Sequence, residues 1–588
     1  MSHRLKGVPA APGIAIGKTI WLQDAPLAVP DRPAELPEVE RQRLRGASQR
    51  VRESTLAFLN DPTRNRQAEQ QAIFDTHLIM LDDPDLWEIV EQGLRQDRLP
   101  AERAWMAAVD FHASRLESLP DEYLQARAVD VRDIGARVLR QLLGLPDVTL
   151  ADLPEPVLLL AEDLLPSDTM TLDATKLLGF CTCQGGPLSH AAILSRALGL
   201  PAIVGVGDAL RAVPGGVLAL ANGTTGDVIV DPDPATVADY RRLHDAQAEQ
   251  KRLARAHAHD SARTVDGIRV EIVANIGSVE DARLALDLGA EGVGLLRTEF
   301  LYMNDQQAPS EPVQVEGYRA ILEVLAMRPV TIRTLDIGGD KCPAYLSLGQ
   351  EANPFLGWRA IRVCLDQPDF FKVQLRALWR AARGHDVRLM FPMIAVPEEF
   401  RRAKALLDEA RQELVAEGVD VAERVQVGMM VEIPSAVVLA ETFAREVDFF
   451  SIGTNDLTQY TFAADRTNAK ISALADSCHP AIFRQIEPVV RAAHANSIWV
   501  GVCGELAGDL EAIPVLLGLG VDELSMAPGR IPAAKHTIRR WSMASSQAIA
   551  RRVLELESSS EARQAVRNAQ VASAVEGPIT PNSGEGLA

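Results

Sequence analysis

A histidine stands at the start of a short apolar segment in GGPLSHAAILSRALGLPAIVG, residues 185–205. Ser189 before it is a good helix N-cap, because its hydroxyl can accept a hydrogen bond from a free backbone N–H. Gly199 and Pro201 are typical of a helix end. His190 therefore falls in the first turn, where the helix dipole favours negative charge. This position suits a histidine that carries a phosphoryl group, and the alternative is a polar surface histidine beside a cap.

Arginines form a second set with chemical potential. Arg297, Arg333 and Arg466 end predicted strands or follow them closely, and Arg359 is a fourth candidate. The guanidinium fork matches the oxygens of a carboxylate or a phosphate. Several arginines that converge on one site predict a small substrate with several negative charges. Arginines that do not converge would instead serve as salt-bridge partners.

Carboxylates and a cysteine follow neighbouring strands. Glu432 and Asp456 end the fifth and sixth predicted strands, and hard oxygen ligands suit Mg²⁺ beside a substrate phosphate. Alternatively, the two carboxylates pair with the arginines. Asn455 adds an amide that can bind an anion. Cys503, in GVCGELAGD, ends the seventh strand in a polar setting, which makes it a candidate nucleophile or proton donor.

Eight apolar runs between residues 266 and 540 supply the elements that must position these side chains. They are RVEIVAN, GVGLLRTE, VTIRTLD, VRLMFPM, VQVGMMVE, FFSIGTND, IWVGVCGE and ELSMA. Near-continuous apolar runs are typical of parallel strands buried on both faces. Their number and spacing predict a (β/α)₈ TIM barrel, and polar residues at most strand ends predict an active site at its C-terminal face.

The chain before residue 266 predicts a different organisation. Residues 7–22 and the runs after residue 150 indicate short strands, whereas residues 35–145 are helical in pattern. We therefore expect a multidomain α/β protein, with a helical bundle inserted into a small α/β domain that contains His190. The predicted parts are residues 1–34 (N-terminal strands), 35–145 (helical), 146–232 (α/β with His190), 233–262 (helical linker), 263–545 (barrel) and 546–588 (helix and disordered tail).

Composition excludes several classes of protein. The 588 residues carry a net charge of −20, which argues against nucleic-acid and anionic-membrane partners. The sequence contains no run of about 18 apolar residues, so it predicts no membrane-spanning helix. Six scattered cysteines without a CxxC pair favour a reducing, cytoplasmic setting.

Seven motifs in combination resemble one family. They are GGPLSHAAILSRALGLPAIVG, GVGLLRTEFLYM, TIRTLDIGGDK, NPFLGWRAIR, MVEIPSA, FFSIGTNDLTQYTFAADR and VGVCGELAGD. The chain resembles enzyme I of the bacterial sugar phosphotransferase system, the phosphoenolpyruvate–protein phosphotransferases, from LKGVPAAPGIAIGK to about residue 540. The resemblance implies that the α/β domain with the inserted helical bundle is a phosphohistidine swivel domain, and that phosphoenolpyruvate phosphorylates His190. It also implies transfer to the histidine phosphocarrier protein HPr, separate or fused, as the first step of sugar uptake.

The resemblance assigns further roles residue by residue. Cys503 would be the proton donor, and the helical block 35–145 would dock HPr. The barrel would form a homodimer. Magnesium would be held by Glu432 and Asp456, and phosphoenolpyruvate would be bound by Arg297, Arg333, Asn455, Asp456 and Arg466.

The chain departs from the family beside the histidine. Enzyme I proteins often carry Arg-Thr before the Ser-His pair and Thr-Ser after it. Here the neighbours are Pro187-Leu188 and Ala191-Ala192, as in enzyme I modules fused to phosphocarrier domains in multiphosphoryl transfer proteins. The family suggests that Thr169 reaches His190.

Two alternatives remain at the sequence level. Pyruvate phosphate dikinases and phosphoenolpyruvate synthases share the histidine domain and the barrel, but they also need a nucleotide-binding domain upstream. Here only about 150 residues precede the histidine domain, and they lack a Gly-rich phosphate loop. A catalytically silent sensor of phosphoenolpyruvate is the other alternative, and retention of His190, Cys503 and both acidic residues argues against it.

The two partners of His190 predict motion. His190 must meet phosphoenolpyruvate at the barrel and later meet the carrier. We therefore expect the α/β domain to move as a rigid body, with hinges near residues 231–234 and near residue 260.

Overall fold

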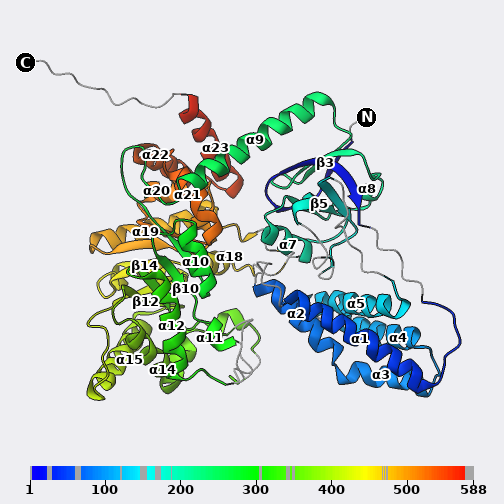
Figure 1. The fold of residues 1–588 in the computed structure, drawn as a ribbon. Helices are drawn as coiled ribbons and strands as arrows, with labels where there is room; N and C mark the ends of the chain where they lie inside the picture. Colours follow the sequence, from blue (N-terminus) through cyan, green and yellow to red (C-terminus); the bar gives the residue numbers. More distant parts are fainter. Residues whose placement is uncertain are drawn as a thin grey trace, which may run out of the picture. The chain divides into compact units, whose positions relative to one another are not determined.

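The chain forms two compact units, residues 1–249 and 250–588, in a computed structural model (Figure 1). The structure describes residues 3–22, 29–59, 68–118, 122–145, 155–165, 168, 174–186, 189–303, 307–338, 345–346, 351–465, 468, 471 and 474–575. No helix in these ranges has the length and hydropathy needed to cross a membrane. The tail that we expect to be disordered, residues 576–588, lies outside them.

One mixed sheet organises the first unit. The strands described there are β1 (His3–Lys6), β2 (Val8–Ala11), β3 (Ile14–Trp21), β4 (Val157–Ala161), β5 (Leu177–Thr182), β6 (Ala202–Val204), β7 (Leu218–Asn222) and β8 (Asp227–Val230). Their order in the sheet is β1-β8-β7-β3-β4-β5-β6-β2. The central strands β3 to β6 pair in parallel, and the outer pairings are antiparallel. The predicted α/β domain is confirmed.

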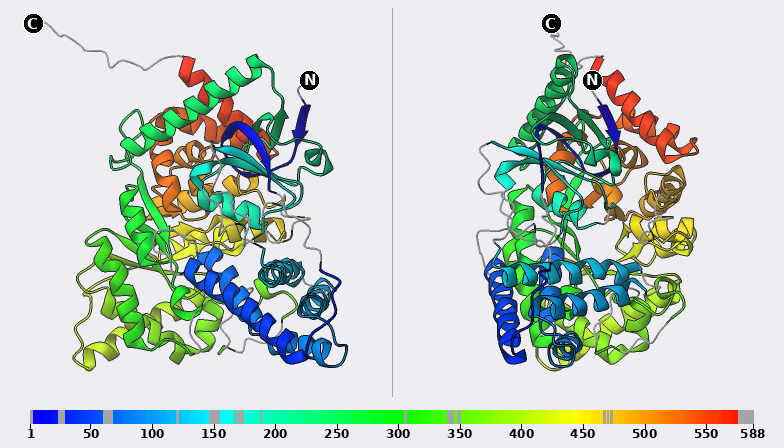
Figure 2. Two further views of the ribbon diagram at one scale, coloured as in Figure 1. Left: turned by 45° about the vertical axis from the view of Figure 1, so that its right-hand side comes forward. Right: turned by 90° about the vertical axis from the view of Figure 1, so that its right-hand side faces the viewer.

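Helices of the first unit fall into two groups. Between β3 and β4 lie α1 (Pro37–Leu59), α2 (Ala68–Leu81), α3 (Pro84–Arg95), α4 (Ala101–Glu117) and α5 (Glu122–Leu143). Later come η1 (Ala174–Lys176), α7 (His190–Leu198), α8 (Asp208–Arg211) and α9 (Pro234–Ala256). Helices α1 to α5 lie side by side as a bundle (Figure 2), with their own core around Trp105 and Val109. Asp83 caps α3 by accepting from the backbone N–H of Asp85 at 2.8 Å. The inserted helical bundle is therefore confirmed.

A closed barrel forms the second unit. Its strands, all described, are β9 (Glu271–Ile276), β10 (Val293–Leu296), β11 (Val330–Arg333), β12 (Val387–Phe391), β13 (Gln426–Val431), β14 (Phe449–Ile452), β15 (Trp499–Val502) and β16 (Glu523–Met526). Every neighbouring pair is parallel, including the closing pair β16–β9. All eight predicted strands are present, so the TIM-barrel prediction is confirmed.

Helices surround these strands. Up to β14 they are α10 (Val279–Asp287), α11 (Phe300–Met303), α12 (Glu311–Leu325), η2 (Pro354–Leu356), α13 (Ile361–Asp366), α14 (Pro368–Ala381), α15 (Pro397–Ala416), α16 (Pro434–Val438) and α17 (Ala440–Phe443). After β14 follow α18 (Thr454–Phe462), α19 (Pro480–Ala495), η4 (Glu505–Gly508), α20 (Ile513–Leu519), η5 (Pro528–Arg530), α21 (Ile531–Ile538), α22 (Met543–Leu554) and α23 (Ser559–Val575).

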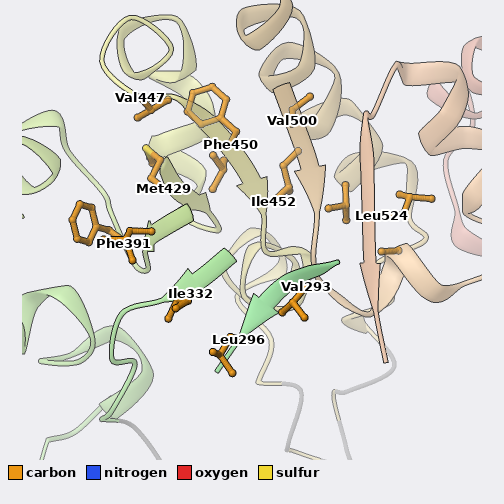
Figure 3. Packing of buried hydrophobic residues seen from close by; sticks show 14 of the residues in the cluster. Val293, Leu296, Ile332, Phe391, Met429, Val447, Phe450, Ile452, Val500 and Leu524 are labelled. Carbon is orange, nitrogen blue, oxygen red and sulfur yellow. The ribbon is translucent and has the colours of Figure 1, made fainter. Parts of the chain in front are cut away.

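Strand alternation divides the barrel side chains into two sets. Phe391, Met429 and Phe450 belong to the large cluster shared by strands and helices (Figure 3). Their sequence neighbours Met390, Met430 and Phe449 instead belong to a separate cluster that includes Cys503. Because successive side chains point to opposite faces of a strand, the second set fills the barrel interior. The same alternation turns the residue at each strand end inward or outward.

The end of α9 is held against the barrel. Arg539 donates to the carbonyls of His257 at 3.0 Å and of Asp260 at 2.7 Å. The buried Lys535 ammonium donates to the carbonyl of Gly289 at 2.8 Å and to that of Asp260 at 3.2 Å. These bonds satisfy carbonyl groups just beyond a helix end. They also oppose rotation near residue 260, so we expect a hinge at another point of the connection.

Candidate active site at the barrel mouth

Four predicted site residues stand where strands end. Arg333 is the last residue of β11, and Arg297, Glu432 and Cys503 directly follow β10, β13 and β15. The carboxyl ends of parallel strands meet at one rim of a barrel, so these side chains share the C-terminal mouth. Arg333 and Glu432 are buried, whereas Arg297 is exposed.

A chain of ion pairs connects the buried arginines. Arg333 contacts Glu299 and Asp336, each at 3.0 Å. Asp336 also contacts Arg359 at 2.9 Å, and Arg359 reaches Asp456 at 3.5 Å. Burial lowers the pKa of Arg333, but the Glu299 and Asp336 carboxylates outweigh burial and hold that pKa above its ordinary value. The two arginines are thus fixed in place before any substrate arrives.

A close approach between the segments around residues 338 and 359 fixes the position of Arg359. Gly338 has φ +118°, and a Cβ there would lie 2.5 Å from the Arg359 Cβ. Only glycine combines this φ with that contact. Arg359 also donates to the Tyr460 hydroxyl at 3.3 Å, and Tyr460 donates in turn to the Phe355 carbonyl at 2.7 Å. Glycine and tyrosine thus orient the guanidinium.

Arg297 differs from the other two arginines. It is exposed, and within the described ranges its guanidinium forms no hydrogen bond or ion pair. Its backbone is fixed, because its N–H donates to the Ile276 carbonyl at 3.0 Å. The side chain can therefore bind an anion that enters the mouth without first breaking an internal pair.

Glu432 is a buried carboxylate with an incomplete set of partners. Its Oε1 accepts from the Met393 backbone N–H at 2.6 Å. Its Oε2 is buried and has no partner among the described residues. Burial, with the charges of Asp456 and Asp336, raises the pKa of Glu432 to about 8. An orphaned buried carboxylate oxygen beside a second carboxylate fits a hard divalent cation.

Helix α18 brings two more site residues into the mouth. Asn455 and Asp456 lie in its first turn, where backbone N–H groups and the helix dipole favour an anion. The Asn455 Oδ1 accepts from the Glu505 backbone N–H at 2.9 Å, which joins α18 to the segment after β15. A Cβ on Gly504 would lie 2.0 Å from the Thr454 Oγ1. Glycine is thus required where the two segments meet.

Cys503 points into the barrel and is 3% exposed. Its Sγ donates to the Ile452 carbonyl at 3.7 Å. Burial, together with the Glu432 charge, raises the pKa of the thiol to about 12. The sulfur is therefore protonated near neutral pH, which favours a proton donor over a thiolate nucleophile.

Asn275 supports the backbone of Cys503 from the other side. Its Nδ2 donates to the Cys503 carbonyl at 2.9 Å, and its Oδ1 accepts from the Ser525 hydroxyl at 2.6 Å. The three residues come from β9, β16 and the end of β15. Asn275 thus ties Cys503 to the closing strands of the barrel.

Several expected site residues are only partly described. His190 is the first residue of α7, as expected, and Gly199 adopts φ +66° at the helix end. Ser189 accepts from the Ala192 N–H at 3.4 Å, which supports the predicted cap. The His190 side chain lies outside the described part of the structure, as do Arg466, Thr169 and the Pro187-Leu188 pair.

The residues after His190 have a structural role. Ala191 and Ala192 are fully buried in the core that includes Leu159 and Phe180. Small side chains there pack against the sheet. Their difference from the family's Thr-Ser pair therefore falls at buried positions.

Glu299 and Asp336 are among the polar residues that follow the predicted strands, whereas no sequence-based prediction covers Gly338 or Tyr460. Tyr460 lies four residues after Asp456 on α18, which is the spacing that puts two side chains on one helix face. That spacing was the available signal for Tyr460. Nothing in the sequence indicates that Gly338 approaches residue 359.

Comparisons with known proteins agree with this architecture. Residues 6–127 match the family described as PEP-utilising enzyme, N-terminal. Residues 153–233 match the mobile domain of PEP-utilising enzymes, and residues 251–543 match their PEP-binding domain.

Similar proteins cover nearly the whole chain. A phosphoenolpyruvate-protein phosphotransferase from Priestia megaterium is 43% identical over 97% of this chain and 99% of its own length. Proteins of the same name from Geobacillus stearothermophilus and Bacillus subtilis (strain 168) are 44% and 43% identical. Each match covers 95% of this chain, and 96% and 98% of the two relatives respectively.

Proposed function

The chain belongs to the phosphoenolpyruvate–protein phosphotransferase family, and we propose that its barrel mouth binds phosphoenolpyruvate for phosphoryl transfer to His190. One observation carries this proposal. The same mouth holds an anion-binding set of arginines and a buried, protonated thiol at Cys503. A substrate with a phosphate, a carboxylate and a carbon that must gain a proton needs both features.

Substrate binding uses groups that are fixed in advance. Arg333 is held by its carboxylate partners, and Arg297 is free to close on the carboxylate or phosphate. The Asn455 Nδ2 has no partner among the described residues, so it can donate to a substrate oxygen. We include Arg466 and Asp456 on the basis of the family resemblance. Preformed charge lowers the barrier because little reorganisation accompanies the reaction.

Glu432 and Asp456 are the residues that would hold Mg²⁺. The unpartnered Oε2 of Glu432 has no other described use, and a cation there would offset the charge of its neighbours. When bound, Mg²⁺ supplies positive charge against the phosphate oxygens.

The proposed reaction has two steps. The bond between phosphorus and the enol oxygen breaks while a ring nitrogen of His190 attacks phosphorus, which leaves enolpyruvate in the mouth. The Cys503 S–H then gives its proton to the methylene carbon, and pyruvate is formed. The thiolate regains a proton from solvent. A raised thiol pKa keeps Cys503 in the protonated form that this step needs.

The phosphoryl acceptor after His190 is proposed to be HPr, which would dock on the helical block 35–145. Ile79 on α2 is 71% exposed and Phe111 on α4 is 53% exposed, which supports a protein-binding surface on these helices. We also propose a cytoplasmic homodimer that forms through the barrel, as in the family resemblance. The domain limits given above and the tail remain part of this proposal.

Intact mass measurement tests the function directly. The protein is incubated with phosphoenolpyruvate and Mg²⁺, and we expect one acid-labile phosphoryl adduct that maps to His190. The reaction should proceed without nucleotide. Dependence on a nucleotide would favour a dikinase or synthase, and tight binding without an adduct would favour a sensor.

A further inference from the structure

Helix α23 places one arginine against three carboxylates. Arg563 contacts Asp509 at 2.7 Å, Asp476 at 3.1 Å and Glu511 at 3.1 Å. The side chains are partly buried, with Arg563 29% exposed and Asp509 25% exposed. Arg563 thus neutralises a group of like charges that would otherwise repel one another.

The three carboxylates belong to segments that lead to the active site. Asp509 directly follows η4, the short helix that begins two residues after Cys503. Asp476 precedes α19, and its Oδ1 also accepts from the Cys478 N–H at 2.9 Å. Arg563 therefore joins the segment after β15 to the segment between α18 and α19.

Both segments are attached to α18. The Ser477 hydroxyl pairs with the Thr458 hydroxyl at 2.9 Å, and the Glu505 N–H donates to Asn455 at 2.9 Å. Thr458 and Asn455 lie on the same helix as Asp456. An ion pair at the C-terminal helix is thus connected to both the thiol and the substrate-binding helix.

We propose that Arg563 is a positioning residue that holds the Cys503 segment in register with α18. This inference rests on the proposed role of Cys503 as proton donor. Without Arg563, repulsion among the carboxylates would separate the segments and displace the thiol from the substrate methylene. A displacement of about 1 Å can slow a reaction by about 10²-fold.

The chain supplies a matched control. Arg567 lies one turn further along α23 and contacts Glu511 at 2.8 Å, with no ion pair to Asp476 or Asp509 in the described structure. Arg563→Met removes the central charge, Arg563→Lys retains a cation, and Arg567→Met removes a neighbouring surface pair. Asp509→Asn weakens the same contact from the other side and provides a second test if Arg563→Met does not fold.

The experiment compares two rates in the full-length variants. One is phosphorylation of His190 by phosphoenolpyruvate, measured by rapid quench. The other is exchange of solvent deuterium into the methyl group of pyruvate, which reports proton transfer. A loss of folded protein would lower both rates equally, so their ratio isolates positioning.

We expect Arg563→Met to slow exchange by about 10- to 100-fold relative to phosphorylation, with little change in KM for phosphoenolpyruvate. Arg563→Lys should recover part of the loss, Asp509→Asn should reproduce it, and Arg567→Met should match the wild type. An unchanged ratio in Arg563→Met and Asp509→Asn would overturn the inference. If Cys503→Ser exchanged as fast as the wild type, the proposed role of Cys503 would fail first, and the inference with it.

Discussion

Replacing the buried Glu432 with glutamine should stabilise the protein near pH 8 while it abolishes turnover. In the metal-free protein the Glu432 carboxylate has one hydrogen-bond donor, and burial together with two neighbouring acids raises its pKa to about 8. An acid with a higher pKa in the folded state binds more protons folded than unfolded. The contribution of Glu432 to folding stability therefore falls as the pH rises from about 4.3, the ordinary glutamate pKa, to about 8. Above about pH 8 this contribution is constant. Glutamine carries no charge and removes this loss.

The magnitude follows from linkage. Within that window the stability difference between Glu432→Gln and wild type should grow by about 1.4 kcal/mol per pH unit. A unit of about 340 residues has an unfolding entropy of about 0.7 kcal/mol/K, so the slope corresponds to about 2 °C in Tm per pH unit. In the variant, the amide atom that replaces Oε2 is also buried without a hydrogen-bond partner. This costs about 1–3 kcal/mol of stability at every pH. The test is therefore the pH dependence of the stability difference between the two proteins, not the size of that difference at one pH.

Scanning calorimetry of the full chain with chelator, from pH 5 to pH 8, measures this slope in the barrel transition. The exposed Glu441 in α17 provides the control, and Glu441→Gln should run parallel to the wild type. Added Mg²⁺ at about ten times its Kd should stabilise the wild type by about 1.4 kcal/mol and the variant much less. A difference that does not change with pH, or equal stabilisation of both proteins by Mg²⁺, would refute the reasoning.

Three further predictions concern the mouth and the histidine. Cys503→Ser should slow pyruvate formation strongly while phosphorylation of His190 remains detectable, and a covalent adduct on Cys503 during turnover would contradict the proton-donor role. His190→Ala should abolish phosphoenzyme, measured by intact mass, and leave the Kd for phosphoenolpyruvate nearly unchanged in calorimetric titration. Gly504→Ala should destabilise the barrel by about 1–3 kcal/mol or more and reduce activity, because its Cβ would collide with Thr454, whereas Gly529→Ala meets no atom within 4 Å and should unfold like the wild type in urea.

The barrel could be predicted from sequence because its strands are locally encoded. Each of the eight apolar runs became a strand, and the polar residues after them came to the C-terminal mouth. Short apolar runs that are buried on both faces have few other stable arrangements. The same reasoning located Arg297, Glu432 and Cys503 at strand ends.

The hinge near residue 260 shows where such reasoning stops. The hinge there is expected because His190 must reach two partners, yet Lys535 in α21 and Arg539 directly after it donate to carbonyl groups of this segment from almost 280 residues along the chain. A hydrogen bond between distant segments has no signature in the local sequence. Arg563 is a similar case, since its partners lie 52 to 87 residues away.

Local sequence patterns encode the order and type of the elements, the family, and the residue types available for chemistry. These depend on periodicity, turn residues and motifs, which act over a few neighbouring positions. The folded barrel sets the charge state, burial and partners of those residues. It left Glu432 Oε2 without a described partner, linked Arg333 to Arg359 through Asp336, and buried the Cys503 thiol so that its pKa rises to about 12. Burial and charge pairing are properties of segments that meet in space, because the dielectric and the neighbouring charges around a group are set by the whole fold.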